Sequence, residues 1–157
     1  MALRSVTRLF SRRALSTTTV RGYSDEMSFT LASGNQVFYD AKSVKQVDVP
    51  SFSGSFGILP KHVPTLAVLK PGVVSVIEDS GNVKKIFVSS GTVTINEDSS
   101  VQILAEEAHP VESLDRSAAQ EVLSKAQSSM SSASTEQARA EAAIAIEVGE
   151  ALVKAVE

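Results

Sequence analysis

The sequence contains no cysteine among its 157 residues, so disulfide bonds, thiolate metal sites and a cysteine nucleophile are all excluded. It also contains no tryptophan, and no apolar run approaches the roughly 18 residues that a membrane-spanning helix requires. Histidine is scarce, since His62 and His109 are the two in the chain and neither stands beside an acid on an evident helix face. We therefore expect neither histidine to bind a metal or to act in catalysis.

Other reactive patterns are missing as well. Ser89-Ser90-Gly91 lacks the residues that surround a nucleophile elbow, and no P-loop or GxGxxG motif follows a strand-like run. Glu106 and Glu107 are adjacent, but neighbouring residues of a strand point to opposite faces and would not form a carboxylate pair. The sequence therefore predicts no catalytic residue, no cofactor site and no metal site.

The first 22 residues contain no acid, but they contain five arginines and are rich in serine and threonine. This composition is typical of an organelle transit peptide, and the arginines interrupt the apolar run that a secretory signal needs. Arg21-Gly-Tyr-Ser24 resembles a mitochondrial processing site, so residues 1–23 are predicted to be a transit peptide, with a disordered basic arm as the alternative. The remainder has 10 basic and 18 acidic residues, a net charge of −8, which gives it no electrostatic reason to bind nucleic acid or an anionic membrane surface.

Glycine and proline are concentrated in one stretch, residues 54–72, where three of each stand among apolar residues. Glycine permits positive φ or a close backbone approach, whereas proline fixes φ and removes a hydrogen-bond donor. This density predicts a rigid, partly buried loop and argues against a helix or a central strand. Such a loop would either shape a β-rich core or present a docking surface.

From Met27 to about Val111, short β-like runs are separated by turn residues at the spacing of an all-β sandwich or barrel. A turn at residues 33–35 joins two runs in which Phe29 and Phe38 are predicted to pair in the core. A second turn at residues 79–82 predicts another hairpin. The strand-like runs are residues 28–32, 36–41, 44–49, 73–77, 83–88 and 101–106. A half-buried face is predicted from Val93, Ile95, Val101, Ile103, Leu104 and Ala105.

After Pro110 the composition changes, because glycine and proline almost vanish and alanine dominates. A serine-rich break and a capping box, Ser134 with Gln137, separate two predicted helices. Their apolar stripes are Leu114, Ala118, Val122, Ala126 and Met130 on the first, and Ala138, Ala142, Ala145, Gly149, Leu152 and Val156 on the second. The predicted fold class is α+β: an antiparallel β-sandwich in residues 24–110, then an antiparallel helical hairpin in residues 111–157.

One ordered motif carries a family resemblance. It reads Gly54-x-x-Gly57-Ile58-Leu59-Pro60-x-His62-x-Pro64, followed by Leu69-x-Pro71-Gly72, with Ser90-Gly91 and the alanine-rich helices in support. On these residues the chain resembles the delta subunits of mitochondrial F-type ATP synthases, which are counterparts of the bacterial and chloroplast epsilon subunits. The resemblance implies a non-catalytic rotor subunit of the central stalk, without a cofactor, on the matrix side of the mitochondrial inner membrane. Its partners would be the gamma subunit, the c-ring and the small mitochondrial epsilon subunit.

The resemblance also implies which residues meet these partners. The predicted contact with the c-ring or gamma consists of Ser53, Gly54, Ser55, Phe56, Lys61 and His62. The residues predicted to shape the loop are Gly57, Pro60, Pro64, Pro71 and Gly72. Phe56 has the alternative of packing inside the sandwich. If Gly57 has a positive φ, a Gly57→Val change is expected to disrupt the loop and to lower coupled ATP synthesis more than ATP hydrolysis.

Two other functions are alternatives to the rotor. Some bacterial relatives bind ATP near the hairpin or extend it as an inhibitory arm, but this chain has Ala118 where their nucleotide motif, which begins at the position of Leu114, has arginine. A regulatory, nucleotide-sensing role is therefore the alternative within the same complex. A free-standing β-sandwich enzyme or carbohydrate-binding module has little support, since the β segment has Tyr39 as its one tyrosine.

Overall fold

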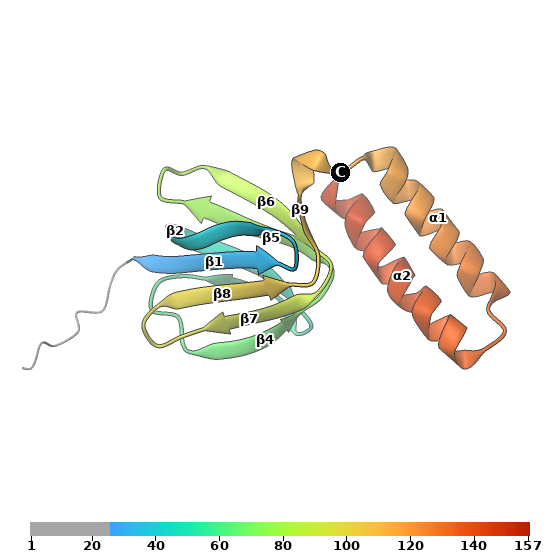
Figure 1. The fold of residues 1–157 in the computed structure, drawn as a ribbon, viewed down its shortest axis with the longest axis horizontal. Coiled ribbons are helices and arrows are strands. Elements are labelled where there is room, and N and C mark those ends of the chain that lie inside the picture. Colours follow the sequence, from blue (N-terminus) through green and yellow to red (C-terminus); the bar gives the residue numbers. More distant parts are fainter. Residues whose placement is uncertain (1–25) are drawn as a thin grey trace, which may run out of the picture.

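The structure is a computed structural model that describes residues 26–157, so the predicted transit peptide, residues 1–23, lies outside the described residues. Strands come first along this part of the chain and two helices follow (Figure 1). The strands are β1 (Met27–Ser33), β2 (Val37–Ser51), β3 (Gly54–Ile58), β4 (Thr65–Leu69), β5 (Gly72–Glu78), β6 (Val83–Val88), β7 (Gly91–Ile95), β8 (Ser100–Ala105) and β9 (Ala108–Pro110). The 3₁₀ helix η1 (Val111–Ser113) leads to α1 (Arg116–Ser132) and α2 (Glu136–Ala155).

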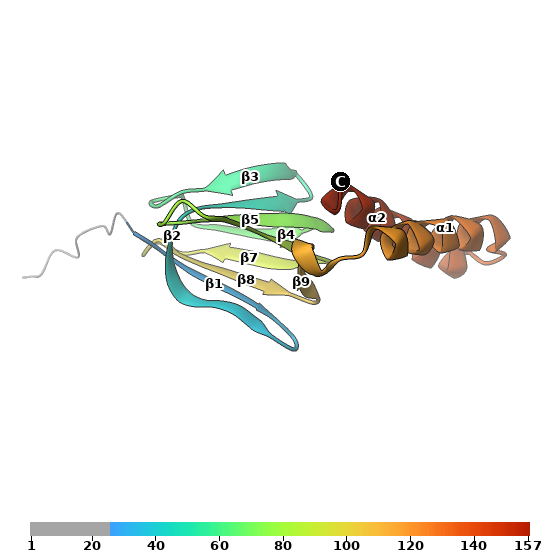
Figure 2. The same cartoon turned by 90° about the horizontal axis from the view of Figure 1, so that it is seen from above.

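The strands form two layers that face each other across the core (Figure 2). They pair in the order β1-β8-β7-β4-β2-β5-β6-β9, with β3 on β2 and a further pairing of β1 with β2. β2 is 15 residues long, so its first half pairs with β1 and its second half with β3 and β5. Of these pairs, β1 with β8 is parallel and the others are antiparallel. The predicted β-sandwich is confirmed.

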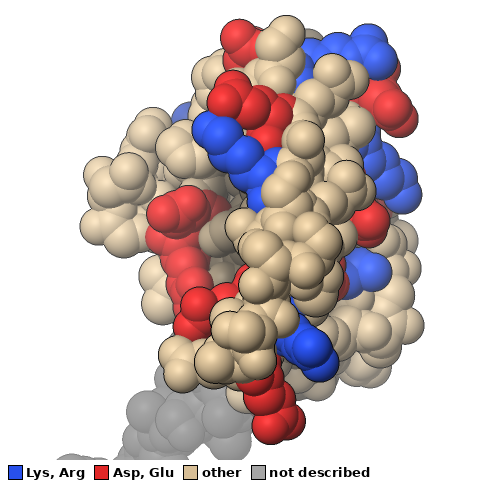
Figure 3. Space-filling view, turned by 90° about the vertical axis from the view of Figure 1, so that its right-hand side faces the viewer, with Lys and Arg blue, Asp and Glu red and all other residues tan. Residues whose placement is uncertain are grey.

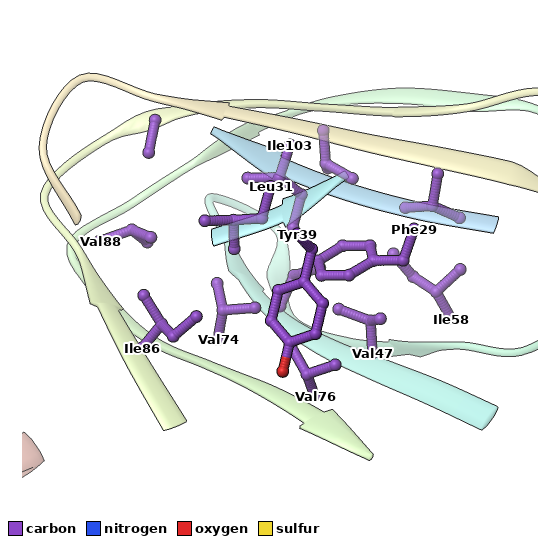
Figure 4. Packing of buried hydrophobic residues seen from close by; sticks show 14 of the residues in the cluster. Phe29, Leu31, Tyr39, Val47, Ile58, Val74, Val76, Ile86, Val88 and Ile103 are labelled. Atoms are coloured by element: carbon purple, nitrogen blue, oxygen red, sulfur yellow. The ribbon is translucent and has the colours of Figure 1, made fainter. Parts of the chain in front are cut away.

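The core lies between the layers and is built from inward-facing residues of each strand (Figure 4). Phe29 was predicted to pair with Phe38, but its ring contacts Tyr39, with 5.2 Å between the ring centroids. A register shift between β1 and β2 places Tyr39 on the inner face and leaves Phe38 half-buried. The core residues labelled in Figure 4 are Phe29, Leu31, Tyr39, Val47, Ile58, Val74, Val76, Ile86, Val88 and Ile103.

The alternation of inward-facing and outward-facing side chains is interrupted at one place in β2. Strict alternation along a strand would place Val44 and Val47 on opposite faces, yet both are buried in the core together with Val49. The register of β2 against β5 shifts between Val44 and Gln46, and a bulge of this kind inserts one extra residue into a strand. The extra residue allows Val44 and Val47 to face the same core.

The stretch of residues 54–72 is not a continuous loop, and that prediction was wrong. It contains the strands β3 and β4, and β4 lies inside the sheet between β7 and β2. The prolines explain how this is possible, because Pro60, Pro64 and Pro71 all lie just outside these strands, where no ladder hydrogen bond is lost. The two glycines of β3 are on a strand that pairs on one side, with β2.

The two predicted helices are confirmed, but their ends differ from the prediction. Asp115 is the N-cap of α1, and its carboxylate accepts from the N–H groups of Ser117 and Ala118 at 2.7 and 3.2 Å. The serines after residue 127 do not break α1, because hydroxyls such as that of Ser132 bond back to helix carbonyls. Thr135, not Ser134, caps α2.

Small side chains line the contact between the helices. The predicted stripe of α2 is confirmed, with Ala142 and Gly149 buried and the remainder half-buried. The stripe of α1 is confirmed at Ala126, which is buried, and at Met130, which is half-buried. Towards the N-terminus of the helix the adjacent Ala119 is buried instead of Ala118, and Val122 is exposed. A Cβ on Gly149 would lie 3.0 Å from the Cα of Leu123, so this glycine sets how closely the helices approach. α2 also contacts β5, and the α1–α2 connection lies at the end of the hairpin away from the sandwich (Figure 1).

Among residues 26–157, no helix is both long enough and apolar enough to cross a membrane.

Candidate functional site

The loop of residues 59–64 joins β3 to β4 at the end of the sandwich away from the hairpin (Figure 2). His62 N–H donates to the Leu59 carbonyl at 3.1 Å, and Lys61 has a φ of 67°. With Pro60 in the second position, this is the pattern of a type II turn. The His62 ring nitrogen Nδ1 lies 2.8 Å from the Val63 carbonyl, and Val63 is 69% exposed. The loop is therefore short, internally bonded and open to a partner.

The predicted contact residues divide between the two ends of β3. Ser53 and Gly54 lie in the exposed turn where β3 begins, and Lys61 and His62 lie in loop 59–64 where it ends. Phe56 is half-buried and packs against the core, which is the alternative placement considered for it, and its ring centroid lies 6.0 Å from that of His62. Ser55 is exposed within β3. The predicted contact residues therefore fall into two groups, one at each end of β3.

The turn at the start of β3 displays an aromatic residue that was not predicted from the sequence. Phe52 is 73% exposed, and its N–H donates to the Val68 carbonyl of β4 at 3.4 Å. The Ser51 hydroxyl donates to the Gly54 carbonyl at 2.7 Å, and Gly54 has a φ of 120°. A phenylalanine between two serines in a turn was the signal available in the sequence.

A larger surface was also missed, the outward side of β1, β8, β7 and β4. These four adjacent strands contain no Asp, Glu, Lys or Arg. Leu66 is 75% exposed and Leu104 is 64% exposed, so the prediction that Leu104 belongs to the buried face was wrong. A shallow depression of about 290 Å³ lies beside Leu104. We call this the uncharged face, and its outward residues are Thr30, Ala32, Leu66, Val68, Thr92, Thr94, Gln102 and Leu104.

An exposed surface of this kind is typical of a protein contact. Soluble proteins rarely leave a large uncharged apolar patch open to water unless a partner covers it. The contrast with β2 and β6 is sharp, because β2 carries Asp40, Lys42, Lys45 and Asp48, and β6 carries Lys84 and Lys85. Phe52 extends the uncharged face beyond β4, since its backbone bonds to Val68.

Both of the predicted loop-shaping glycines, Gly57 and Gly72, lack a positive φ. The premise of the predicted Gly57→Val effect was therefore wrong. A Cβ there would approach Asp48 Oδ1 at 2.8 Å and Gln46 Nε2 at 3.2 Å, and both are ends of flexible side chains. Gly72 instead permits a close approach, because its Cβ would lie 3.1 Å from two ring carbons of Pro50.

Tyr39 is the group in this domain whose pKa is most clearly displaced. Its hydroxyl donates to Glu78 Oε1 at 3.2 Å, and Lys84 Nζ lies 3.4 Å from the same oxygen. Burial, together with the negative charge of Glu78, raises the pKa of Tyr39 to about 12. Lys42 and Lys84 lie 5.7 and 5.8 Å from the centre of its ring. The arrangement fixes the end of β5 against β2.

This pKa predicts a loss of stability at alkaline pH. An unfolded tyrosine ionises near 10, whereas folded Tyr39 keeps its proton until about 12, so the folded state binds more protons in that interval. Its contribution is complete below about pH 10 and is lost as the pH rises through about 12, by on the order of 1 to 2 kcal/mol after allowance for solvent screening at the hydroxyl. Urea unfolding at pH 9 and pH 11.5 would measure the loss. Tyr39→Phe should remove this part of the pH dependence, and an unchanged slope in the variant would contradict the assignment.

Reactive clusters are absent from the part of the chain that the structure describes. No group of three or more His, Asp or Glu side chains within it is placed to hold a metal ion. His109 lies in β9, paired with Phe87, and His62 lies in loop 59–64. On the face that presents the hairpin, acidic and basic side chains alternate with uncharged surface (Figure 3). The Asp115 carboxylate, part of the run considered for nucleotide binding, is occupied as the cap of α1.

A β-sandwich with an open uncharged face, followed by a helical hairpin, is the architecture of a protein that works through contacts with other proteins. The family model for the ATP synthase delta/epsilon chain β-sandwich domain matches residues 26–111. The model for the C-terminal domain of the metazoan delta subunit of F1F0-ATP synthase matches residues 114–155. The chain therefore belongs to the delta/epsilon subunit family of ATP synthases.

Relatives along the whole chain agree with this family. The mitochondrial ATP synthase subunit delta of Caenorhabditis elegans is 51% identical over 131 residues, which cover 83% of this chain and 80% of the relative. That of Saccharomyces cerevisiae is 37% identical over 156 residues, covering 96% of each. A chain of the Euglena gracilis mitochondrial ATP synthase, in a structure of OSCP, F1 and c-ring, has the same fold, with a TM-score of 0.81 at 22% identity over 98% of this chain and 100% of that one.

Proposed function

We propose that this chain is a non-catalytic rotor subunit of the mitochondrial proton-translocating ATP synthase, on the matrix side of the inner membrane. Its task is to fasten the gamma subunit to the c-ring so that torque from proton flow reaches the catalytic sites on other subunits. The relatives are named as mitochondrial delta subunits, and a Tetrahymena thermophila chain of similar fold (TM-score 0.63) comes from a structure of a central stalk and c-ring. The observation that supports the proposal is that one sandwich presents two separate surfaces suited to protein contacts, the uncharged face and loop 59–64.

We assign the uncharged face and the adjoining turn at Phe52 and Ser53 to gamma. A permanent contact that must carry torque needs a broad, largely apolar interface, and the uncharged face spans four strands. We assign loop 59–64 to the c-ring, because it lies at one end of the sandwich and presents a small, rigid tip in which Lys61 and His62 stand beside the exposed Val63. This divides the predicted contact residues between two partners, with Ser53 and Gly54 on the gamma side. The small epsilon subunit packs beside the sandwich.

The sandwich suits this task mechanically. Force passing from loop 59–64 to the uncharged face crosses β3 and β4, both of which are hydrogen-bonded into the sheet. Their core residues Ile58 and Leu69 are fully buried, and a close-packed interior has low compressibility. Pro60 and Pro64 remove backbone freedom from the loop between these strands.

The proposal is tested by removing the chain from the enzyme and adding it back. Mitochondrial membranes depleted of the chain should lose ATP synthesis driven by a proton gradient but keep ATP hydrolysis by the catalytic head. Recombinant residues 24–157 should restore synthesis. Equal loss of synthesis and hydrolysis would contradict a coupling role, and binding of ATP to the isolated chain in a calorimetric titration would favour the regulatory alternative.

A further inference from the structure

Two residues with an unusual backbone conformation are joined across the loop end of the sandwich. In residues 26–157, three non-glycine residues have a positive φ: Ala41, Lys61 and Ser99. The N–H of Lys61 donates to the Ser99 hydroxyl oxygen at 3.1 Å. Two of these three residues are therefore hydrogen-bonded to each other, although they lie 38 positions apart in the sequence. Non-glycine residues keep such a conformation where the surroundings hold it, and these places cluster at functional sites.

Each of the two occupies a position that normally favours glycine. Lys61 is the third residue of the turn that begins at Leu59, where a type II turn requires a positive φ. Ser99, with a φ of 64°, ends the turn of residues 96–99, in which its N–H donates to the Asn96 carbonyl at 3.2 Å. A type I turn followed by a left-handed residue is a common hairpin loop, and glycine is the usual residue at that position.

A serine at position 99 supplies a hydroxyl that can accept a hydrogen bond, which glycine cannot do. Its side chain is 4% exposed, and its oxygen satisfies a backbone N–H of the neighbouring loop. The turn that holds it is fixed in its own right, because Asn96 N–H donates to the Ser100 carbonyl at 2.9 Å and the Ser100 hydroxyl donates to Asp98 Oδ1 at 2.6 Å. Loop 59–64 is thereby attached to a rigid hairpin end, that of β7 and β8, in the layer that contains β4.

We propose that Ser99 is a positioning residue for the rotor contact. Its hydroxyl oxygen, by accepting the Lys61 N–H, holds loop 59–64 in the conformation that meets the c-ring. The role of the loop rests on the proposed function, whereas the attachment itself does not. Without the hydroxyl the loop keeps its own turn and its continuation into β4, but Lys61 loses its hydrogen bond to the hairpin of β7 and β8.

The absence of cysteine allows a single probe to report on the loop. A nitroxide on Val63→Cys, in the full chain, is expected to become more mobile when Ser99 is replaced by alanine or by glycine. Ser99→Gly suits the positive φ, so its effect is separable from destabilisation of the fold. The matched control is Ser89→Ala, because the Ser89 hydroxyl accepts the Glu107 N–H at 3.2 Å in the same way, outside loop 59–64 and the turn that holds it. The control should leave the nitroxide unchanged.

The second measurement uses the assembled enzyme. Cross-linking from Val63→Cys to the c-ring, and gradient-driven ATP synthesis, should both fall by roughly two- to tenfold with Ser99→Gly, the factor that corresponds to one ordinary hydrogen bond. ATP hydrolysis by the detached head should not change. Unchanged mobility, or greater mobility with undiminished cross-linking and synthesis, would overturn the proposal. If the chain with Ser99 intact forms no cross-link to the ring while the mobility difference remains, the ring assignment fails and the attachment by Ser99 stands.

Discussion

Replacing Leu66 with aspartate is expected to abolish stable binding to gamma while the chain remains folded. Leu66 is 75% exposed on β4, one of the four strands without charged residues, so an aspartate is well solvated in the free chain. In the complex the same carboxylate would be buried without a cationic partner. The affinity for gamma should fall by at least about 100-fold, which corresponds to about 2.7 kcal/mol.

A matched control distinguishes this surface from exposed apolar residues in general. Val83 is 55% exposed on β6, which lies in the other part of the sheet and neighbours two lysines. Val83→Asp should bind gamma as the unsubstituted chain does. Binding can be measured by titrating labelled chain with purified gamma, with circular dichroism as the test of folding. Equal losses for the two variants, or none for Leu66→Asp, would refute the assignment of the uncharged face.

Replacing Gly91 with alanine is expected to cause the largest loss of stability in the sandwich. A Cβ there would lie 2.3 Å from the carbonyl oxygen of Leu104 and 2.8 Å from the Cα of Ala105. Both are backbone atoms of β8, which pairs with β7 at this point, so they cannot move as a flexible side chain would. The free energy of unfolding should fall by about 3 kcal/mol or more, or the chain should fail to fold.

The control for Gly91 is Gly81, which has a φ of 88° but no heavy atom within 4 Å of the point that an added Cβ would occupy. Gly81→Ala carries the conformational cost alone, about 1 kcal/mol. Urea unfolding of both variants at neutral pH separates the steric cost from the conformational one. Equal losses would show that backbone conformation, and not the approach of β8, makes glycine necessary at position 91.

The order of elements, strands first and then two helices, was readable from the sequence because the local signals agree with the fold. Turn residues at 33–35 and 79–82 lie between strands, and the loss of glycine after Pro110 marks the start of the helical part. The prediction of a continuous loop over residues 54–72 was wrong because the glycines and prolines are not spread evenly through the stretch. The prolines flank β4, whose own five residues, Thr65–Leu69, include neither glycine nor proline.

The contact site was harder to predict, because exposure depends on pairing between distant segments. Phe56 was an obvious candidate, yet it packs against the core, while Phe52 is exposed. The absence of charge from four separate segments was visible in the sequence. That these segments are adjacent became evident only with the strand order. The link between Lys61 and Ser99 likewise joins two turns that no local pattern connects.

The central claim is that one sandwich holds two partners on two different surfaces. Because the chain has no cysteine, single cysteines at Val63 and Leu104 can each carry a short photoactivatable cross-linker in the assembled enzyme. The account predicts that position 63 cross-links to the c-ring and that position 104 cross-links to gamma. Cross-linking of both positions to the same subunit, or the reverse pairing, would contradict it.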